Sequence, residues 1–512
     1  MSESLIIIDF GSQYTRLIAR RVREANVYCE IHPYSSEWSD VAGLNPKGVI
    51  LSGGPNSVYD DAAPLAPTWV YDKGIPVLGI CYGLQVLAYQ MGGKVIPSNK
   101  KEYGDAVIES YNEHHSLMQG LEFPMHVWMS HGDQVSDVPP GFEPLAYTEN
   151  SPVAVMGNTN GIFGLQFHPE VVHTRQGSKI ITNFLREICG FVGDWTPNNF
   201  VEESVQRIKE QVGSARVICA LSGGVDSTVT AALIHKAIGD QLTCIFVNNG
   251  LLRKEEHNRI IDNFVEKMDF NLKYVDATNL FLEKLSGVLD PELKRKIIGQ
   301  EFIRVFETES GNMGEVEFLA QGTLYPDVIE SQTSENEASA KIKTHHNVGG
   351  LPEDMKFKLV EPLRYLFKDE VREAGIALGL PEDMVYRQPF PGPGLAIRII
   401  GEITWDKLEI LRECDWIVID EIKKAEMYDD LWQSFAVLTD TKSVGVMGDF
   451  RTYGYMVAIR AVTSEDAMTA DWARLPYEVL ANISNRIVNE VPEVNRVVYD
   501  VTSKPPGTIE WE

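Results

Sequence analysis

A cysteine stands between two glycines in the segment Pro76–Val86, which reads PVLGICYGLQV. An apolar strand that enters Gly79-Ile80-Cys81-Tyr82-Gly83 and leaves as a helix has the form of a nucleophile elbow, with Cys where hydrolases usually carry Ser. The glycines let the backbone turn sharply, and the helix N-terminus favours a thiolate and offers an amide N–H to an oxyanion. Cys81 is therefore a candidate nucleophile, with a buried structural cysteine as the alternative on spacing alone.

A candidate base follows a later apolar run, in Phe163–Glu170, which reads FGLQFHPE. A thiolate, a histidine that shuttles protons and a carboxylate that fixes the histidine tautomer make a catalytic triad, and His168 and Glu170 can supply the last two groups. After another predicted strand, Gly53 and Gly54 can bring backbone amides close to a developing oxyanion.

These three motifs, in this order and spacing, resemble the class I glutamine amidotransferase domain over roughly residues 1–195. The resemblance implies that Cys81 attacks the side-chain amide of glutamine, forms a glutamyl thioester and releases ammonia. It implies that His168 protonates the leaving ammonia and activates water, while Glu170 orients His168. The oxyanion and glutamine contacts that it implies are Gly53, Gly54, Tyr82, Gln85, Ser130, His131, Gly132 and Asp133.

A second glycine-rich turn lies in Val217–Thr228, which reads VICALSGGVDST. Small residues let consecutive backbone N–H groups face outward, and the dipole of the following helix adds positive potential, so the turn can hold an anion. It is not a Walker A loop, because G-x-x-x-x-G-K-[ST] is missing. The turn resembles the PP-loop of ATP pyrophosphatases, S-G-G-x-D-S, which matches in full; an ordinary βα turn is the alternative.

The PP-loop resemblance implies cleavage of ATP between its α- and β-phosphates, with adenylate transferred to an acceptor oxygen. Asp226 would hold Mg²⁺, which is expected as the cofactor that comes with ATP. The ATP-binding residues expected are Ser222, Gly223, Gly224, Val225, Asp226, Ser227 and Thr228, with Val247 at the end of the next strand beside the base.

A cationic, glycine-hinged segment, Lys341–Pro352, reads KIKTHHNVGGLP. We expect it to be a lid that brings positive charge to phosphates and excludes water, with a solvated loop as the alternative. Its phosphate-facing residues would be Lys341, Lys343, His345 and His346. The polar stretch before it, Ser331–Ala340, is expected to be a mobile loop.

A glutaminase joined to an adenylating domain predicts amidation of an activated oxygen. Glutamine-dependent asparagine synthetases expose a cysteine at the N-terminus, where this chain has Ser2. CTP synthetases use a Walker-type site, which is absent. Thiolating PP-loop enzymes usually need further catalytic cysteines, but Cys219 and Cys244 lie inside predicted strands.

Three segments of the last third, Gln388–Arg398, Asp449–Val462 and Ser503–Glu512, resemble the glutamine-hydrolysing GMP synthetase family. That family converts XMP to GMP with ATP and glutamine, so the resemblance implies these three substrates and a homodimer. Lys504 and Arg398 would bind phosphate. The full set of XMP contacts that it implies is Arg295, Asp327, Glu330, Arg398, Gln433, Lys504, Ile509 and Glu510.

The elements that must position these residues follow a βαβ rhythm in a chain of 512 residues. With the resemblances, the fold class is multidomain α/β: a mixed-sheet amidotransferase domain at 1–195, a parallel-sheet ATP pyrophosphatase at 196–387 and an α+β dimerisation and XMP-binding domain at 388–512. Val171–Cys189 is expected to be one helix, and the last part of the chain is expected to be less helical than the rest.

Charge and cysteine usage limit the partners and the compartment. The net charge of −27 disfavours nucleic acid as the main partner. Six cysteines without a C-x-x-C motif indicate reducing cytoplasm, and no run is long enough for a transmembrane helix or placed as a signal peptide.

Two other functions stay open on sequence alone. The chain could be a binding or regulatory protein that kept the folds and lost catalysis, although the intact motifs argue against this. It could also amidate a different adenylated carbonyl, which substrate competition would separate from XMP.

Overall fold

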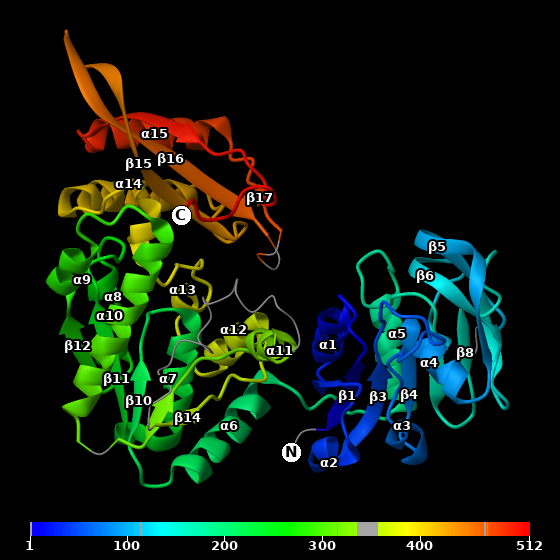
Figure 1. Cartoon of the computed structure of the whole chain (residues 1–512). Coiled ribbons are helices and arrows are strands. Elements are labelled where there is room, and N and C mark those ends of the chain that lie inside the picture. The colour runs from blue at the N-terminus through cyan, green and yellow to red at the C-terminus, as the bar shows by residue number, and fades with distance from the viewer. Residues whose placement is uncertain are drawn as a thin grey trace. The chain divides into compact units, whose positions relative to one another are not determined.

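A computed structural model describes residues 3–112, 115–314, 316–334, 357–447, 449–464, 467 and 469–512. The chain forms two compact units, Met1–Phe200 and Val201–Glu512, each shown in Figure 1. The proposed boundary between residues 387 and 388 lies inside the second unit and stays a prediction. No helix of the described residues is both long enough and apolar enough to cross a membrane.

The first unit is built on one mixed sheet of nine strands, in the order β2-β1-β3-β4-β9-β8-β7-β5-β6. The first five strands of that order run parallel and the remaining pairs are antiparallel. The strands are β1 (Ser4–Asp9), β2 (Tyr28–Pro33), β3 (Pro46–Leu51), β4 (Val77–Ile80), β5 (Lys94–Ser110), β6 (Met125–Asp137), β7 (Glu143–Tyr147), β8 (Val155–Gly157) and β9 (Ile162–Leu165).

The parallel half of this sheet places the first site. Strands β1, β3 and β4 are almost continuous apolar runs because helices cover both of their faces. Figure 1 shows α1 (Thr15–Glu24), α4 (Tyr82–Gln90) and α5 (Gly177–Asn183) beside these strands. The carboxyl ends of parallel strands meet at one edge, so the turns after β3, β4 and β9 come together there.

The second unit contains an all-parallel sheet in the order β12-β11-β10-β13-β14. Its strands are β10 (Val217–Ala220), β11 (Leu242–Asn248), β12 (Leu272–Asp276), β13 (Phe318–Ala320) and β14 (Lys358–Val360). Its helices are α6 (Pro197–Val212), α7 (Val225–Ile238), α8 (Glu256–Ile261), α9 (Thr278–Leu285), α10 (Pro291–Gly311), α11 (Tyr325–Ser334), α12 (Lys368–Ala377) and α13 (Glu382–Val385).

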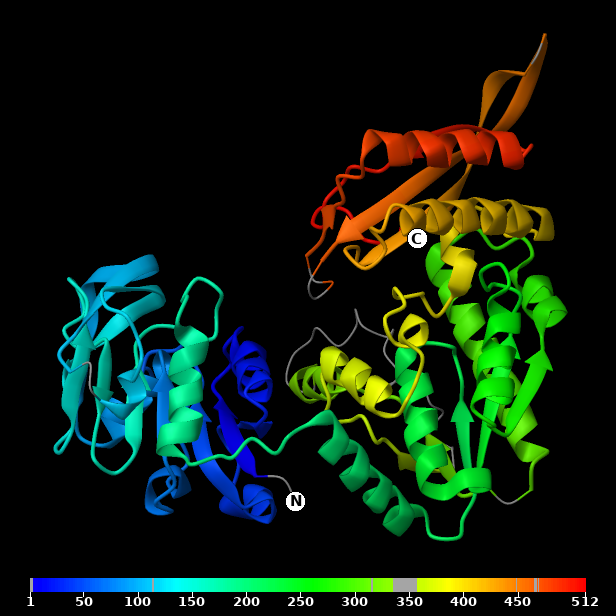
Figure 2. The same ribbon diagram turned by 180° about the vertical axis from the view of Figure 1, so that it is seen from behind.

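The last part of the chain adds a second sheet, in which β15 (Gln433–Met447), β16 (Phe450–Thr463) and β17 (Asp471–Trp472) are antiparallel and β18 (Val494–Tyr499) pairs parallel with β16. Helices α14 (Trp405–Lys424) and α15 (Tyr477–Glu490) run alongside it, and the β15–β16 ribbon projects beyond both, as Figure 2 shows. One hydrophobic core joins residues of β10 and β11 with residues of α14, β15, β16 and α15. The multidomain α/β class is confirmed.

Two local predictions were wrong, and a third was confirmed. The helix expected at Val171–Cys189 begins only at Gly177, because Thr174 folds back and donates its hydroxyl to the carbonyl of His168 at 2.7 Å. The last part of the chain is less helical than the rest, as expected, and its two α-helices in the described residues are α14 and α15. The polar stretch expected to be a loop from residue 331 is still helix as far as Ser334, and its remainder lies outside the described residues.

Candidate active sites

The turn after β4 holds Cys81 in a backbone conformation that L-residues rarely adopt, with φ +52° and ψ −106°. A Cβ atom on Gly83 would lie 2.3 Å from the carbonyl oxygen of Leu51, so only glycine fits where the helix crosses β3. The amide of Cys81 donates to the carbonyl of Leu165 at 2.7 Å. This hydrogen bond to the neighbouring strand holds Cys81 in its strained conformation, directly before the first residue of α4. A strained residue between a strand and a helix is the arrangement of an activated nucleophile.

His168 and Glu170 lie beside this thiol, and both side chains are buried. His168 Nδ1 is 2.7 Å from Glu170 Oε1, and the ring also hydrogen-bonds to Cys81. Burial opposes protonation of His168, but the hydrogen bonds and charges of Cys81 and Glu170 outweigh it and raise its pKa to about 10. The histidine therefore carries its proton at neutral pH and can protonate a leaving group.

The middle of strand β6 lies against the cysteine. Cys81 Sγ is 3.5 Å from the carbonyl oxygen of Ser130, and the buried amide of Gln85 donates to the carbonyl of Asp133 at 2.9 Å. The carboxylate of Asp133 accepts hydrogen bonds from Ser57 and Tyr59. Gln85 and this stretch of β6 thus lie next to the nucleophile.

The other residues expected around glutamine divide into near and distant groups. A Cβ atom on Gly53 would lie 3.2 Å from the ring of His168, so this backbone is close to the histidine. A Cβ atom on Gly54 would meet Phe10 and Tyr82 instead. The side chain of Tyr82 is buried and donates to the carbonyl of Pro64 at 2.9 Å, which leaves only its backbone for the site.

His131 does not present its side chain to the site, because its ring turns away and contacts Glu102 on β5. Sequence reasoning missed Glu102. The signal that could have found it is weak: a single glutamate inside a long strand, with no motif around it. The register of the β5–β6 ladder, which pairs Glu102 with His131, is what brings the two together.

The second glycine-rich turn connects β10 to α7 and is braced by its own hydroxyls. Ser222 Oγ is 3.0 Å from Ser227 Oγ and accepts from the amide of Gly224 at 3.3 Å, while Thr228 caps the carbonyl of Gly224 at 2.8 Å. Gly223 has φ +75°. The helix N-terminus and the glycine backbone therefore lie together at the carboxyl edge of the parallel sheet, an arrangement suited to holding an anion.

Two cations that sequence reasoning missed also contact this turn. Lys368, the first residue of α12, lies 2.6 Å from both carboxylate oxygens of Asp226. Arg387 donates to the carbonyl of Gly223 and pairs with the buried Glu256. Neither cation lies in a phosphate-binding motif, so only the fold shows that they belong here. Val247, expected beside the base, is buried in β11.

Three of the residues expected to contact XMP lie together where the C-terminal tail packs against the rest of the second unit. Arg398, which is fully buried, donates to both carboxylate oxygens of Glu510 at 3.0 and 2.8 Å and stacks over Phe435. The amide of Gln433 donates to the same Glu510 oxygen at 2.8 Å. These three side chains form one cluster.

The rest of the tail is held by other contacts. Ile509 packs in a small apolar cluster, and its carbonyl accepts from Arg460. The Lys504 ammonium donates to the carbonyl of Ala467 at 2.7 Å. Arg295 donates to the backbone of Glu512.

The remaining predicted contacts are not brought to this cluster or cannot be described. The carboxylate of Asp327 accepts from the amide of Leu324 at the start of its own helix. The side chain of Glu330 and the four lid residues Lys341, Lys343, His345 and His346 lie outside what the structure describes.

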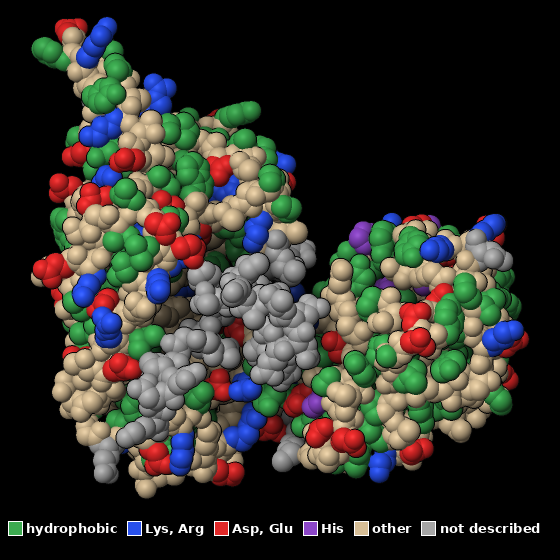
Figure 3. Space-filling view, in the orientation of Figure 1, with side chains coloured by type: hydrophobic (Ala, Val, Ile, Leu, Met, Phe, Trp, Pro, Cys, Tyr) green, Lys and Arg blue, Asp and Glu red, His purple; other side chains and the backbone are tan. Residues whose placement is uncertain are grey.

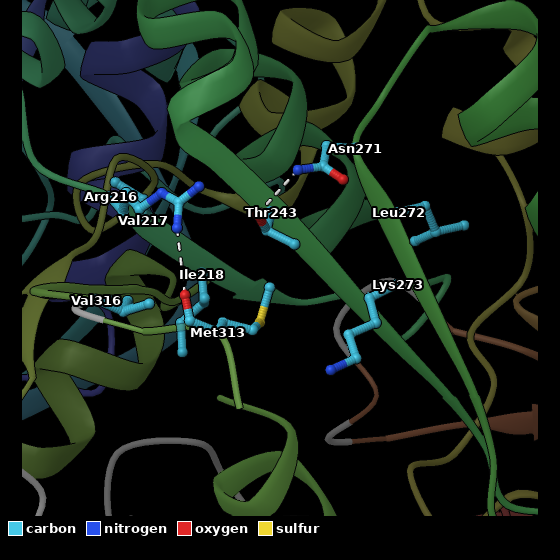
Figure 4. Close-up of a pocket in the computed structure, with 9 residues that line it drawn as sticks. All are labelled: Arg216, Val217, Ile218, Thr243, Asn271, Leu272, Lys273, Met313 and Val316. Atoms are coloured by element: carbon cyan, nitrogen blue, oxygen red, sulfur yellow. Dashed lines mark hydrogen bonds between the residues drawn. The ribbon is translucent and has the colours of Figure 1, made fainter. Parts of the chain in front are cut away.

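A pocket of about 410 Å³ lies at the opposite, amino edge of the parallel sheet. Figure 4 shows Arg216 donating to the backbone of Met313 and Asn271 donating to Thr243, so its polar groups already bond one another. Lys273, the other cation, pairs with Glu309 at 2.5 Å. This pocket lies away from the glycine turn and holds none of the predicted residues.

The fold and these sites define an amidotransferase joined to a nucleotide-activating domain. The family model described as glutamine amidotransferase class-I matches residues 6–188. The model described as NAD synthase matches residues 198–295, and the one described as GMP synthase C terminal domain matches residues 420–511.

Curated relatives match along the whole chain. A glutamine-hydrolysing GMP synthase of Dehalococcoides mccartyi (strain CBDB1) is 64% identical over 100% of this chain and 96% of its own length. One of Carboxydothermus hydrogenoformans is 58% identical over 100% of both chains. The chain belongs to the glutamine-hydrolysing GMP synthase family.

Proposed function

We propose that this chain hydrolyses glutamine at Cys81 and uses the ammonia to convert XMP, activated as an adenylate, into GMP. As a member of its family the chain is a ligase that makes GMP with glutamine as the amide donor. The observation that carries the assignment of sites is that one chain holds both a buried Cys–His–Glu set and the S-G-G-x-D-S turn, each at the carboxyl edge of its own sheet.

The glutaminase steps use protons that the site already holds. The Cys81 thiolate attacks the amide carbon of glutamine, and the C–N bond breaks as His168 gives its proton to the leaving ammonia. The neutral His168 then takes a proton from water as that water attacks the thioester. The C–S bond breaks, glutamate leaves, and the thiolate and the charged histidine are restored. Glu170 stabilises the charged ring and fixes its orientation.

The synthetase steps begin at the glycine turn after β10. The turn and the N-terminus of α7 hold the phosphates of ATP, and a carbonyl oxygen of XMP attacks the α-phosphorus while pyrophosphate leaves. Ammonia then adds to the activated carbon, and AMP leaves with the former XMP oxygen. Lys368, Arg387 and the backbone of the turn offset the charge of the departing pyrophosphate.

Asp226 is the residue that would hold Mg²⁺. No group of three or more His, Cys, Asp or Glu side chains that could hold a metal occurs among the described residues. A single, partly exposed carboxylate fits a magnesium ion that arrives bound to ATP, because Mg²⁺ is commonly held by one or two carboxylates together with substrate phosphates. When bound, the ion would neutralise phosphate charge.

For XMP, the proposal uses the tail cluster. Glu510 and Gln433 present polar groups suited to a base or ribose. Positive charge comes from Lys504 on the tail and from Arg295 on α10, which contacts the tail at Glu512. Arg398 is already paired with Glu510, so binding a phosphate there would require that pair to open. Asp327, Glu330 and the lid residues remain part of the proposal as further contacts with the nucleotides.

The proposal extends to a homodimer that works in the cytoplasm. Four apolar side chains near the far end of the β15–β16 ribbon are exposed: Val444, Val446, Phe450 and Tyr453. Figure 3 shows hydrophobic side chains among charged ones at this projecting end, which supports a second copy as the partner. None of the six cysteines, which all lie among the described residues, forms a disulfide, and this supports a reducing compartment.

An oxygen-18 experiment tests the reaction directly. XMP labelled at its C2 oxygen is incubated with the chain, ATP, Mg²⁺ and glutamine, and the products are analysed by mass spectrometry. The expected products are GMP, glutamate, pyrophosphate and AMP in equal amounts, with the label in the AMP phosphate. Unlabelled AMP, or ADP and orthophosphate as primary products, would contradict adenylation of XMP; no turnover at all would favour a binding protein.

A further inference from the structure

A buried ion pair lies beneath the glutamine site, between two strands of the first sheet. Glu102 on β5 and His131 on β6 are directly paired residues of an antiparallel ladder. Their side chains are only 7% and 1% exposed, and His131 Nε2 lies 3.2 Å from Glu102 Oε2. The mechanism above uses neither side chain, although buried charges are costly without a function or full compensation.

The carboxylate of Glu102 is satisfied by donors on every side. It accepts from Thr148 at 2.8 Å and from Ser151 at 2.5 Å, in addition to the histidine. Burial by itself raises the pKa of Glu102, but the hydrogen bonds from His131, Ser151 and Thr148 reverse the effect and lower it to about 2. Glu102 therefore stays ionised, and an ionised carboxylate can only accept hydrogen bonds.

The other nitrogen of His131 also faces an acceptor. Nδ1 lies 2.9 Å from the backbone carbonyl oxygen of Asp133, which likewise can only accept. A neutral imidazole has one N–H, so it could donate to one of these oxygens but not to both. The ring of His131 therefore bridges the Glu102 carboxylate and the Asp133 carbonyl, and both contacts are satisfied only when both nitrogens carry hydrogen.

The carbonyl of Asp133 is the point at which this pair meets the glutamine site. It accepts from the amide of Gln85 at 2.9 Å as well as from His131. Gln85 lies on α4, one turn after Cys81, and Ser130 next to His131 places its carbonyl 3.5 Å from the thiol. A change in the His131 contact would therefore move the backbone that borders both Gln85 and the nucleophile.

We propose that Glu102 and His131 are positioning residues for glutamine: their buried contact fixes the Asp133 carbonyl, and with it Gln85 and the stretch of β6 against Cys81. The inference rests on the proposed glutaminase role of this unit. Neither residue contacts the reacting atoms. The pair sets the affinity for glutamine and leaves the synthetase steps untouched.

The other groups in contact with this stretch of β6 define what a kinetic experiment can report. Lys101 on β5 lies against Gly132, Tyr59 hydrogen-bonds the Asp133 carboxylate, and Cys81 contacts Ser130. His168 is the proton-carrying group near the thiol, and it acts in the bond-breaking step rather than on the shape of the strand. An effect on KM for glutamine is therefore separable from an effect on kcat.

The main test is Glu102→Gln, with Asp105→Asn as the matched control. Asp105 pairs with His126 across the same two strands, but these side chains are 60% and 57% exposed. Glu102→Gln is expected to raise KM for glutamine roughly 10-fold or more, from loss of a charge-assisted hydrogen bond, with ammonia-driven GMP synthesis unchanged. Asp105→Asn is expected to change neither activity by as much as 2-fold, roughly.

The split between KM and kcat separates positioning from general loosening. In Glu102→Gln the rise in KM for glutamine should come with little change in kcat, because neither residue of the pair contacts the reacting atoms. An unchanged KM, or a kcat that falls as much as KM rises, would overturn the proposal.

A second variant guards against a variant that folds poorly. His131→Gln removes the other partner of the pair and should raise KM for glutamine as Glu102→Gln does, with ammonia-driven synthesis unchanged. A folded His131→Gln chain with the unsubstituted KM would overturn the proposal. If the unsubstituted chain does not hydrolyse glutamine, the proposed function fails; if it does and Glu102→Gln behaves like Asp105→Asn, only the present inference fails.

Discussion

The glutaminase site and the synthetase site differ in how they hold charge before any substrate is present. Around Cys81 the groups are buried, and each charged or polar side chain is fixed by a neighbour in the same unit, as His168 is by Glu170. In the second unit the cations and anions that should meet nucleotides are paired with one another, as in Lys368 with Asp226 and Arg398 with Glu510.

This difference matches the charges of the substrates. Glutamine has no net charge, so its site gains from rigid geometry and a strained nucleophile that is already in position. ATP and XMP carry phosphates, so their sites must hold positive charge without leaving it buried and unpaired, and internal ion pairs achieve this. Binding then exchanges one set of partners for another, which makes the second site the more adaptable of the two.

The strongest way to break the comparison is Cys81→Ala. We expect it to reduce glutamine-driven GMP synthesis on the order of 10³-fold or more, because no other group can form the thioester. Synthesis from ammonium salts should persist, since the glycine turn lies in the other unit. Steady-state assays with each nitrogen source measure this, and a folded variant that lost both activities would show that the two sites are not separate.

The second prediction concerns the phosphate of XMP. Lys504→Ala should weaken the binding of XMP by roughly 10- to 150-fold, because a hydrogen bond to a charged group contributes about 1.5–3 kcal/mol. The effect should appear in the apparent affinity for XMP and leave that for ATP alone. Lys424→Ala is the control, since that lysine is exposed and pairs within its own helix with Asp420. Equal XMP affinities in both variants would show that Lys504 is structural.

The third prediction concerns the pH dependence of the rigid site. Because the pKa of His168 is raised to about 10, the histidine is protonated below that pH, and glutamine-driven activity should fall only as the pH passes about 10. Glu170→Gln removes a charge that favours the protonated ring of His168, so the fall in activity should begin at lower pH. At pH 9 the variant should have about 10-fold less glutamine-driven activity than the unsubstituted chain. Ammonia-driven synthesis, assayed in parallel, should show no such shift; a fall that stays near pH 10 would exclude the role of Glu170.

The smallest expected effect tests how tightly the first site is packed. Gly53→Ala adds a Cβ atom 3.2 Å from the ring of His168, so kcat/KM for glutamine should fall by roughly 3- to 10-fold, a cost of about 1 kcal/mol. Gly43→Ala is the control, since a Cβ atom there meets nothing within 4 Å. A Gly53→Ala chain with unchanged kinetics would mean that the site tolerates displacement and is less rigid than proposed.

The sequence predicted those parts whose chemistry is local. Cys81 between its glycines and the Ser222–Ser227 turn are short motifs at strand-to-helix junctions, so residue types alone locate them. The strands predicted before Cys81 and before Gly53 are likewise present, as β4 and β3. Residues recruited from distant elements could not be found in this way: Glu102 reaches His131 through strand register, and Lys368 reaches Asp226 across 142 positions of chain.

Helix Val171–Cys189 and the last third show another limit of local patterns. Two valines open the stretch Val171–Gln176, which was expected to be helical, but side-chain hydrogen bonds of Thr174 hold it as a turn. In the last third, α14 and α15 are long helices whose apolar residues face a core shared with other elements. Their burial depends on partners that no local window contains.

The hydrophobic core that joins β10 and β11 to α14 and β15 has a consequence for how this gene can be divided. A cut near residue 200 separates two units that each keep their own core, so the amidotransferase could be encoded alone and supplied in trans. A cut near residue 388 would divide a single core and expose apolar surface on both fragments. Gene fission should therefore be tolerated at the first position and selected against at the second.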